Sequence, residues 1–154
     1  MKTDKNSRQE RILSLIRENE ISTQEDLTAK VNQSGFEATQ ATISRDIKEL
    51  GIIKITLPNK ATKYCVLDRT GDTAPGRLLA VFTNSIISVN QAMNTIIIKT
   101  LPGMASAAAS ALDSMHLEEC IGTIAGDDTI FAACPGIEEA KALLITINDM
   151  TEKG

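Results

Sequence analysis

Apolar residues recur at three- and four-residue intervals over the first 50 positions, which is the spacing of amphipathic helices. They are Ile12, Leu13 and Ile16 in a first helix, Leu27 and Val31 in a second, and Ile43, Ile47 and Leu50 in a third. We expect these helices to begin at Ser7, at the capping box Ser22–Glu25 and at Thr39, and the last two to stop at Gly35 and Gly51. The pattern predicts three short helices.

A β pattern follows the third helix directly. Residues 52–58 and 63–67 are rich in β-branched and aromatic side chains, and the polar residues 59–62 separate them. Three short helices followed by a hairpin form the layout of a winged helix-turn-helix domain. A generic three-helix domain is the alternative that this pattern leaves open.

The rest of the chain has a different pattern. Apolar runs predict strands at residues 78–89, 95–101, 117–125 and 129–134, and helical spacing predicts helices at residues 103–115 and 137–150. This ββαββα order predicts an α+β fold with a mostly antiparallel four-stranded sheet and its helices on one face. The other face would be bare, and its β-branched residues favour a partner subunit.

A polar stretch separates the two patterns. Residues 68–77 are rich in Gly, Pro, Thr and Asp, which predicts a linker between a DNA-binding domain at residues 1–67 and an oligomerisation and ligand-binding domain at residues 78–154. The net charge of −4 is divided unevenly between these parts. Residues 1–67 hold 11 Lys and Arg against 9 Asp and Glu, whereas residues 68–154 hold 5 against 11. This asymmetry indicates that the two domains bind different partners.

The outward face of the third helix carries the candidate DNA contacts. Gln40, Ser44, Arg45 and Lys48 share this face with one Ala, while the acidic residues of the helix lie on its flank. Arg can pair with guanine, Gln with adenine, and Ser or Lys with phosphate, so the face suits the major groove of double-stranded DNA. An ordinary solvated helix face is the alternative.

Other function classes find little support. His116 is the sole histidine, no nucleophile elbow accompanies it, and Cys65, Cys120 and Cys134 form no CxxC pair. We therefore expect no enzyme, no metal site, no cofactor and no disulfide scaffold. The polar N-terminus and the absence of a long apolar stretch predict a cytoplasmic protein without a membrane partner.

Asp127 and Asp128 stand side by side between two predicted strands, and three hypotheses account for them. Gly-Asp-Asp is a good hairpin turn. Paired carboxylates can also hold Mg²⁺, although this chain lacks the further ligands that such an enzyme needs. Alternatively, they bind a cationic ligand together with Asp113 and Ser106, which lie on one face of the preceding helix, if that helix end approaches the turn of a neighbouring subunit.

Three stretches carry a family resemblance. "TQATISRDIKELGIIK", "IIIKTLPGMA" and "GTIAGDDTI" are similar to the recognition helix and the effector-domain signatures of bacterial arginine repressors. The resemblance implies a repressor that pairs trimers into hexamers and regulates genes of arginine biosynthesis or catabolism. It also implies L-arginine as corepressor at the trimer–trimer interface, held by Asp127 and Asp128 with help from Asp113. Ser106 departs from the family, whose members commonly have Gln there.

Other classes of function remain as alternatives. The first is an amino-acid sensor of the feast/famine type, whose effector domain orders its strands and helices differently. The second is an enzyme fused to a DNA-binding module, and the third is an assembly protein without a ligand. Arginine titration separates the third from the repressor.

Overall fold

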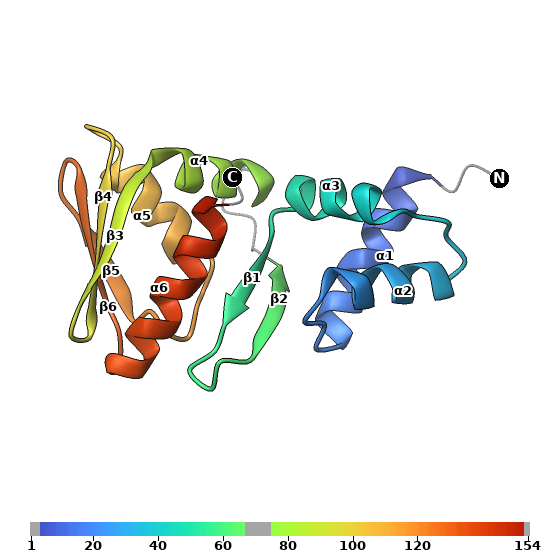
Figure 1. The fold of residues 1–154 in the computed structure, drawn as a ribbon. Helices are drawn as coiled ribbons and strands as arrows, with labels where there is room; N and C mark the ends of the chain where they lie inside the picture. Colours follow the sequence, from blue (N-terminus) through green and yellow to red (C-terminus); the bar gives the residue numbers. More distant parts are fainter. Residues whose placement is uncertain (1–3, 67–74, 153–154) are drawn as a thin grey trace.

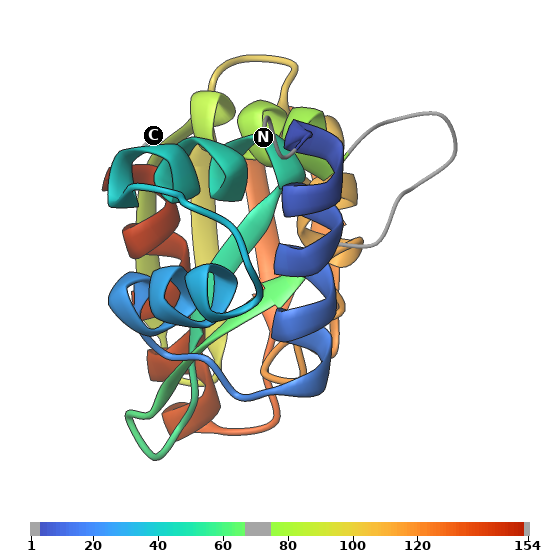
Figure 2. The same cartoon turned by 90° about the vertical axis from the view of Figure 1, so that its right-hand side faces the viewer.

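A computed structural model describes residues 4–66 and 75–152 of the chain (Figure 1). The N-terminal part contains α1 (Lys5–Glu18), α2 (Gln24–Gln33), α3 (Gln40–Leu50) and the antiparallel hairpin of β1 (Ile52–Thr56) and β2 (Thr62–Val66). Figure 2 looks onto the three helices, behind which the hairpin lies. The predicted winged helix-turn-helix is thereby confirmed, because the hairpin follows the third helix as a wing.

The ends of these helices agree with most of the sequence signals. Thr39 caps α3 by accepting a hydrogen bond from the Thr42 amide at 3.2 Å, and Gly51 ends it at φ 67°. Two predicted starts were wrong. Asp4 rather than Ser7 caps α1, and Thr23 rather than Ser22 caps α2, because the backbone is still extended at Thr23.

The C-terminal part is a four-stranded antiparallel sheet with helices on one face. Its elements are α4 (Pro75–Ser85), β3 (Ile86–Ala92), β4 (Thr95–Thr100), α5 (Ala105–Asp113), β5 (Gly122–Ala125), β6 (Thr129–Ala133) and α6 (Ile137–Glu152). The strand order is β3-β4-β6-β5. The α+β class and the ββαββα order are confirmed. No helix among the described residues has both the length and the apolar character to cross a membrane.

The prediction of a strand from residue 78 was wrong for its first part. Residues 78–85 belong to α4, and only from Ile86 does the chain become a strand. Leu78 and Phe82 are four residues apart and join the same core, in which Phe82 is fully buried. Helical spacing and packing against the neighbouring helices therefore decide the structure of this stretch, although its apolar run suggested a strand. Of the predicted linker, residues 75–77 belong to α4, and residues 68–74 lie outside the described residues.

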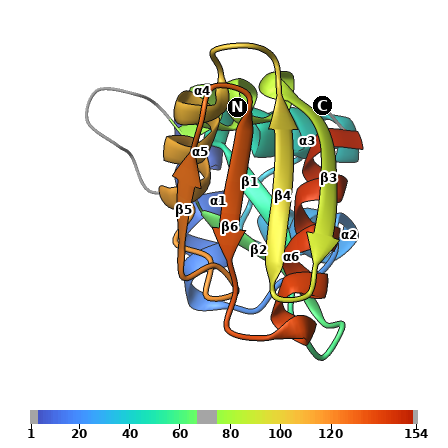
Figure 3. The same cartoon turned by 90° about the vertical axis from the view of Figure 1, so that its left-hand side faces the viewer.

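One face of the sheet is bare in the single chain, as Figures 1 and 3 show. Across this face, the neighbouring strands bring Asn90, Ile97, Phe131 and Ile124 into one row. Ile124 is 74% exposed and Phe131 is 50% exposed. The opposite face of the sheet is covered by helices and buries Ile96, Ile98, Ile130 and Ala132. The sheet thus has one buried face and one exposed apolar face.

Strand β1 belongs to the cores of both parts. Ile52 packs with the N-terminal helices, whereas Ile53 and Ile55 join the core that contains the sheet and α6. The Thr56 amide also donates to the Thr146 hydroxyl of α6 at 2.8 Å in a buried hydrogen bond. The division of the chain at residues 68–77 stays a prediction, but this strand already links the two parts on the N-terminal side of it.

Candidate functional site

The outward face of α3 presents the predicted DNA contacts to solvent. Gln40, Arg45 and Lys48 are exposed and Ser44 is half-buried. Ser44 and Lys48 also line a groove of about 390 Å³ that β1, α4 and α6 border from the other side. This half of the face therefore lies where the N-terminal part meets the C-terminal part, which the sequence did not predict.

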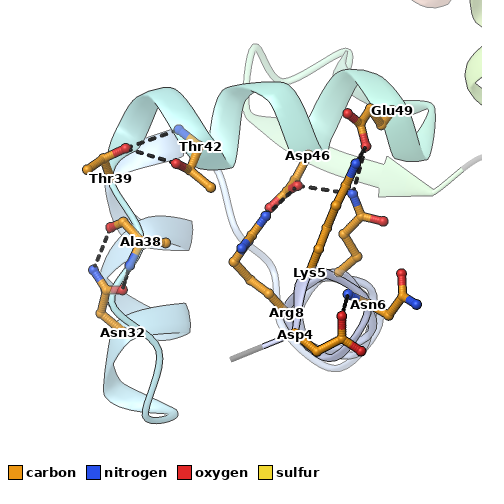
Figure 4. A network of polar contacts seen from close by, with 11 residues as sticks. Asp4, Lys5, Asn6, Arg8, Asn32, Ala38, Thr39, Thr42, Asp46 and Glu49 are labelled. Carbon is orange, nitrogen blue, oxygen red and sulfur yellow. Dashed lines mark hydrogen bonds and ion pairs between the residues drawn. The ribbon is translucent and has the colours of Figure 1, made fainter. Parts of the chain in front are cut away.

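Asp46 is the most deeply buried polar residue of α3, with 1% of its surface exposed. Arg8 of α1 approaches it with two nitrogens, Nε at 2.6 Å and Nη2 at 3.1 Å, and Gln9 donates at 3.0 Å (Figure 4). Burial raises the pKa of Asp46, but the hydrogen bonds from Arg8 and Gln9 and the nearby cations outweigh it, so the pKa lies below its ordinary value. The carboxylate is ionised and fully committed to α1.

Glu49, the other carboxylate near the end of α3, is also held by α1. Lys5 lies 2.7 Å from it and Gln9 donates to it at 3.0 Å (Figure 4). Hydrogen bonds from Lys5 and Gln9 lower the pKa of Glu49. Because α1 engages both acidic side chains, their negative charge is directed away from the outward face of α3, where the DNA contacts are predicted.

The turn between α2 and α3 is fixed by Asn32. Its side chain donates to the Ala38 carbonyl at 3.1 Å and accepts from the Ala38 amide at 2.8 Å (Figure 4). Gln24 also donates to the Gln40 carbonyl at 2.9 Å. These contacts fix the angle between the two helices, which a recognition helix needs to enter the groove. Sequence reasoning missed Asn32; its only signal was an Asn near the end of α2.

Asp127 and Asp128 form the turn between β5 and β6, and both are exposed. The Gly126 amide donates to the Thr129 carbonyl at 2.8 Å, which closes the hairpin. Two further amides fix the turn from outside it, since Thr100 donates to the Asp128 carbonyl at 2.8 Å and Ala105 to the Asp127 carbonyl at 3.2 Å. The hairpin hypothesis is confirmed, and the backbone bonds leave the carboxylates exposed on a rigid support.

The other two predicted ligand residues lie at opposite ends of α5. Ser106 is exposed in the first turn of the helix, directly after the residue whose amide binds Asp127. Asp113 is the last residue of α5 and accepts a hydrogen bond from the Thr123 hydroxyl at 2.9 Å. A helix of this length separates its ends by about 12 Å. One chain therefore brings Ser106, but not Asp113, to the acidic turn.

Sequence reasoning also missed two threonines that hold the acidic side chains. Thr123 donates to Asp113, and Thr129 donates to Asp128 at 2.9 Å. Both belong to the stretch GTIAGDDT, and each stands on a strand beside the acidic turn or helix end. The alternation of strand residues was the signal that could have placed them on an accessible edge.

The three cysteines and His116 are the side chains that could serve as a nucleophile or a base. No two of the three cysteines form a disulfide, and burial raises the pKa of Cys120 to about 11, so its thiol stays protonated at neutral pH. His116 follows α5 with φ 49°, and its amide donates to the Asp113 carbonyl at the helix end. Among the described residues, no three His, Cys, Asp or Glu side chains are grouped closely enough to hold a metal ion.

Comparison with known proteins covers both parts of the chain. Residues 3–72 match the family model "Arginine repressor, DNA binding domain", and residues 82–149 match "Arginine repressor, C-terminal domain". An arginine repressor of Acetivibrio thermocellus is 43% identical over 148 residues, which cover 96% of this chain and 97% of that protein. The chain belongs to the arginine repressor family.

Two further arginine repressors show similar agreement. That of Caldicellulosiruptor saccharolyticus is 43% identical over 97% of this chain and 99% of its own length, and that of Alkaliphilus oremlandii is 48% identical over 82% and 85%. Arginine repressors are DNA-binding transcriptional regulators, so the predictions of a regulator and of a non-enzyme are confirmed. The ββαββα order and the family match together exclude the feast/famine type.

Proposed function

We propose that this chain binds operator DNA through α3 and takes L-arginine as its effector at the acidic turn, thereby regulating genes of arginine biosynthesis or catabolism in the cytoplasm. The observation that carries the proposal is the pair of exposed carboxylates, Asp127 and Asp128, on a turn that three backbone hydrogen bonds hold in place. Adjacent carboxylates repel each other, and a dication-like ligand with a guanidinium and an α-ammonium relieves that repulsion.

The surroundings of the turn favour a small polar ligand. Ser106 supplies a hydroxyl near the turn, and the N-terminus of α5 lies next to the turn, where the positive end of the helix dipole attracts the carboxylate of an amino acid. An amino acid with a cationic side chain thus finds partners for its side chain and for its main-chain groups. This complementarity supports arginine rather than a neutral amino acid.

We propose a trimer whose subunits pack through the bare sheet face, and a hexamer made of two such trimers. The row of Ile97, Phe131 and Ile124 gives this face an apolar centre of the kind that subunit interfaces bury. Asp113 supports the second step, because it lies at the far end of α5 from its own acidic turn. A neighbouring copy would bring an Asp113 to that turn and complete the set of carboxylates.

Regulation then follows from linkage between ligand, assembly and DNA. Arginine that binds between subunits stabilises the assembled state by its differential affinity for that state. An assembly presents several copies of α3 to one operator, and multivalent binding raises the affinity without any new contact in a single domain. DNA affinity therefore rises with arginine concentration.

Calorimetric titration of the full chain tests the effector. We expect heat of binding with L-arginine and none with citrulline, which has the same shape but no side-chain charge. Ornithine and lysine test whether the planar guanidinium is needed, because they carry an ammonium in its place. Duplexes that bind the protein can be selected from random DNA. Fluorescence anisotropy titrations of these duplexes should show that the protein binds them more tightly when arginine is present. Equal binding of citrulline, or DNA affinity that ignores arginine, would overturn the proposal.

A further inference from the structure

A chain of two hydrogen bonds connects the acidic turn to a lysine on the bare sheet face. The Lys99 ammonium donates to the Thr129 hydroxyl at 2.8 Å, and that hydroxyl donates to Oδ1 of Asp128 at 2.9 Å. An ammonium can only donate and an ionised carboxylate can only accept, so the hydroxyl must accept from Lys99 and donate to Asp128. The direction of both bonds is thereby fixed.

The strands themselves position this chain of bonds. Lys99 and Thr129 are register partners on the adjacent antiparallel strands β4 and β6, which lie side by side in Figure 3. The next residues, Thr100 and Asp128, are joined through a backbone hydrogen bond of 2.8 Å. Lys99 is therefore held next to the acidic turn by two paired strands.

Lys99 is unusual in this part of the chain. Between residues 78 and 152, the sequence has only two Lys or Arg residues, Lys99 and Lys141. Lys141 ion-pairs with Glu138 in the first turns of α6, at the end of the sheet opposite to the acidic turn. Lys99 is thus the one Lys or Arg that residues 78–152 place beside Asp127 and Asp128.

The threonine keeps the two charges apart. The two bonds place the ammonium within about 6 Å of Asp128, a range in which opposite charges still influence each other. Within the described residues, however, no direct ion pair joins Lys99 and Asp128. One oxygen of Asp128 accepts from Thr129, and the carboxylate keeps lone pairs for another donor.

We propose that Lys99 and Thr129 set the affinity and selectivity of the acidic turn for its cationic ligand. Lys99 offsets part of the negative charge, so a cation binds firmly only when it also makes directed hydrogen bonds. Thr129 acts as a spacer that prevents Lys99 from pairing with Asp128 and occupying the ligand's place. This inference rests on the proposed binding of arginine at Asp127 and Asp128.

The first test removes the charge of Lys99 in the full chain. Calorimetry on Lys99→Met should show arginine binding about two- to fivefold tighter at low salt, because the repulsion between the Lys99 ammonium and the cationic ligand is lost. In 1 M salt, where the Debye length is about 3 Å, the gain should vanish. Lys99→Arg keeps the charge and should bind as wild type does.

Lys141→Met is the matched control for Lys99→Met. It removes the other basic side chain of this region, far from the turn, and changes the net charge of the protein equally. It should leave arginine affinity unchanged at both salt concentrations. Equal effects of the two substitutions, or an effect of Lys99→Met that is independent of salt, would overturn the electrostatic role of Lys99.

The second test removes the spacer. Thr129→Val keeps the shape of the side chain and suits a strand, so thermal unfolding serves to confirm that the variant is folded. Without the hydroxyl, Lys99 pairs directly with Asp128, and we expect arginine affinity to fall about fivefold or more. Adding Lys99→Met to Thr129→Val should restore the affinity, because no ammonium is left to occupy Asp128.

The double variant also separates the outcomes. If it binds as weakly as Thr129→Val alone, Thr129 acts on its own and the spacer role is wrong. The proposed effector site is judged separately by wild type and Asp128→Asn. If wild type does not bind arginine, the proposed function fails; if wild type binds and Asp128→Asn binds poorly while the Lys99 variants are silent, only this inference fails.

Discussion

Two sets of aspartates in this chain have opposite surroundings. Asp46 is buried at 1% exposure and receives hydrogen bonds from the guanidinium of Arg8 and the amide of Gln9. Asp127 and Asp128 are exposed, and the only side chain that donates to either of them, among the described residues, is that of Thr129. The protein uses one carboxylate to join two helices and leaves the other two accessible at a turn.

This contrast follows from the cost of burying charge. A buried carboxylate stays ionised only where fixed hydrogen-bond donors replace water. Its oxygens are therefore occupied by donors of the protein itself and cannot bind a ligand. An exposed carboxylate keeps its solvation and can exchange water for a ligand. Removing Asp46 should therefore affect stability, whereas removing Asp127 or Asp128 should affect binding.

Substitution of Asp46 should have the largest effect. Asp46→Ala leaves Arg8 and Gln9 without their partner at a buried contact between α1 and α3, and we expect a loss of about 3 kcal/mol in the free energy of unfolding. Urea unfolding followed by circular dichroism at matched protein concentration measures it. Glu49→Ala is the control, since its carboxylate is exposed and its loss should change stability little. Equal stability of the two variants would contradict the structural role of Asp46.

Asp128→Asn tests the other side of the comparison. It keeps the size and turn preference of the residue but removes a charge-assisted hydrogen bond to the ligand, worth roughly 1.5–3 kcal/mol. Calorimetry should show arginine affinity lower by about 10- to 150-fold. Stability without arginine should hold or rise, because repulsion from Asp127 is relieved. Unchanged affinity in the folded variant would leave this turn with a purely structural role.

Arg45→Ala tests the exposed face of α3, which depends on the Asp46 contact for its orientation. If Arg45 contacts a base, its loss should cost roughly 1–3 kcal/mol at the selected duplex and relax specificity at one position. Lys48→Ala is the companion variant and should weaken binding to all sequences while lowering the salt dependence. Anisotropy titrations at two salt concentrations distinguish them. If Arg45→Ala binds both the selected duplex and random DNA with the affinity of wild type, α3 is not the recognition helix.

The pH dependence of stability should reveal the buried ion pair between Asp46 and Arg8 in the wild-type protein. The pKa of Asp46 is lowered by its partners from an ordinary value of 3.8, so its ion pair contributes its full stability above that value. This contribution is lost as the pH falls through the lowered pKa of the folded state. Urea midpoints measured from pH 6 to pH 2.5 should fall less steeply below pH 4 in Asp46→Asn than in wild type. Parallel profiles would contradict the shift.

Ser106→Gln should give the smallest change. A longer amide beside the acidic turn can add one neutral hydrogen bond to the ligand, worth about 0.5–1.5 kcal/mol. We expect arginine affinity to rise about two- to tenfold in calorimetry, and Ser106→Ala to lower it slightly, because the hydroxyl that faces the ligand is lost. Weaker binding by Ser106→Gln would show that the departure at this position has no cost for the ligand.

The sequence by itself determined the elements whose signals are local. Helical spacing and the caps Thr39 and Gly51 predicted α3, and alternating apolar runs predicted the sheet. These signals succeed because capping and amphipathic burial act between residues a few positions apart. The turn at Asp127 and Asp128 was also predicted, since its chemistry is contained in four consecutive residues.

Only the tertiary structure decided what lies between distant segments. It buried Asp46 against Arg8, 38 positions away, and gave the two faces of β1 to two different cores. It made residues 78–85 a helix, because Phe82 packs into the C-terminal core. It also connected Lys99 through Thr129 to Asp128. Such contacts depend on which elements become neighbours, and long-range packing overrides local preference wherever burial and paired charges contribute more free energy than propensity does.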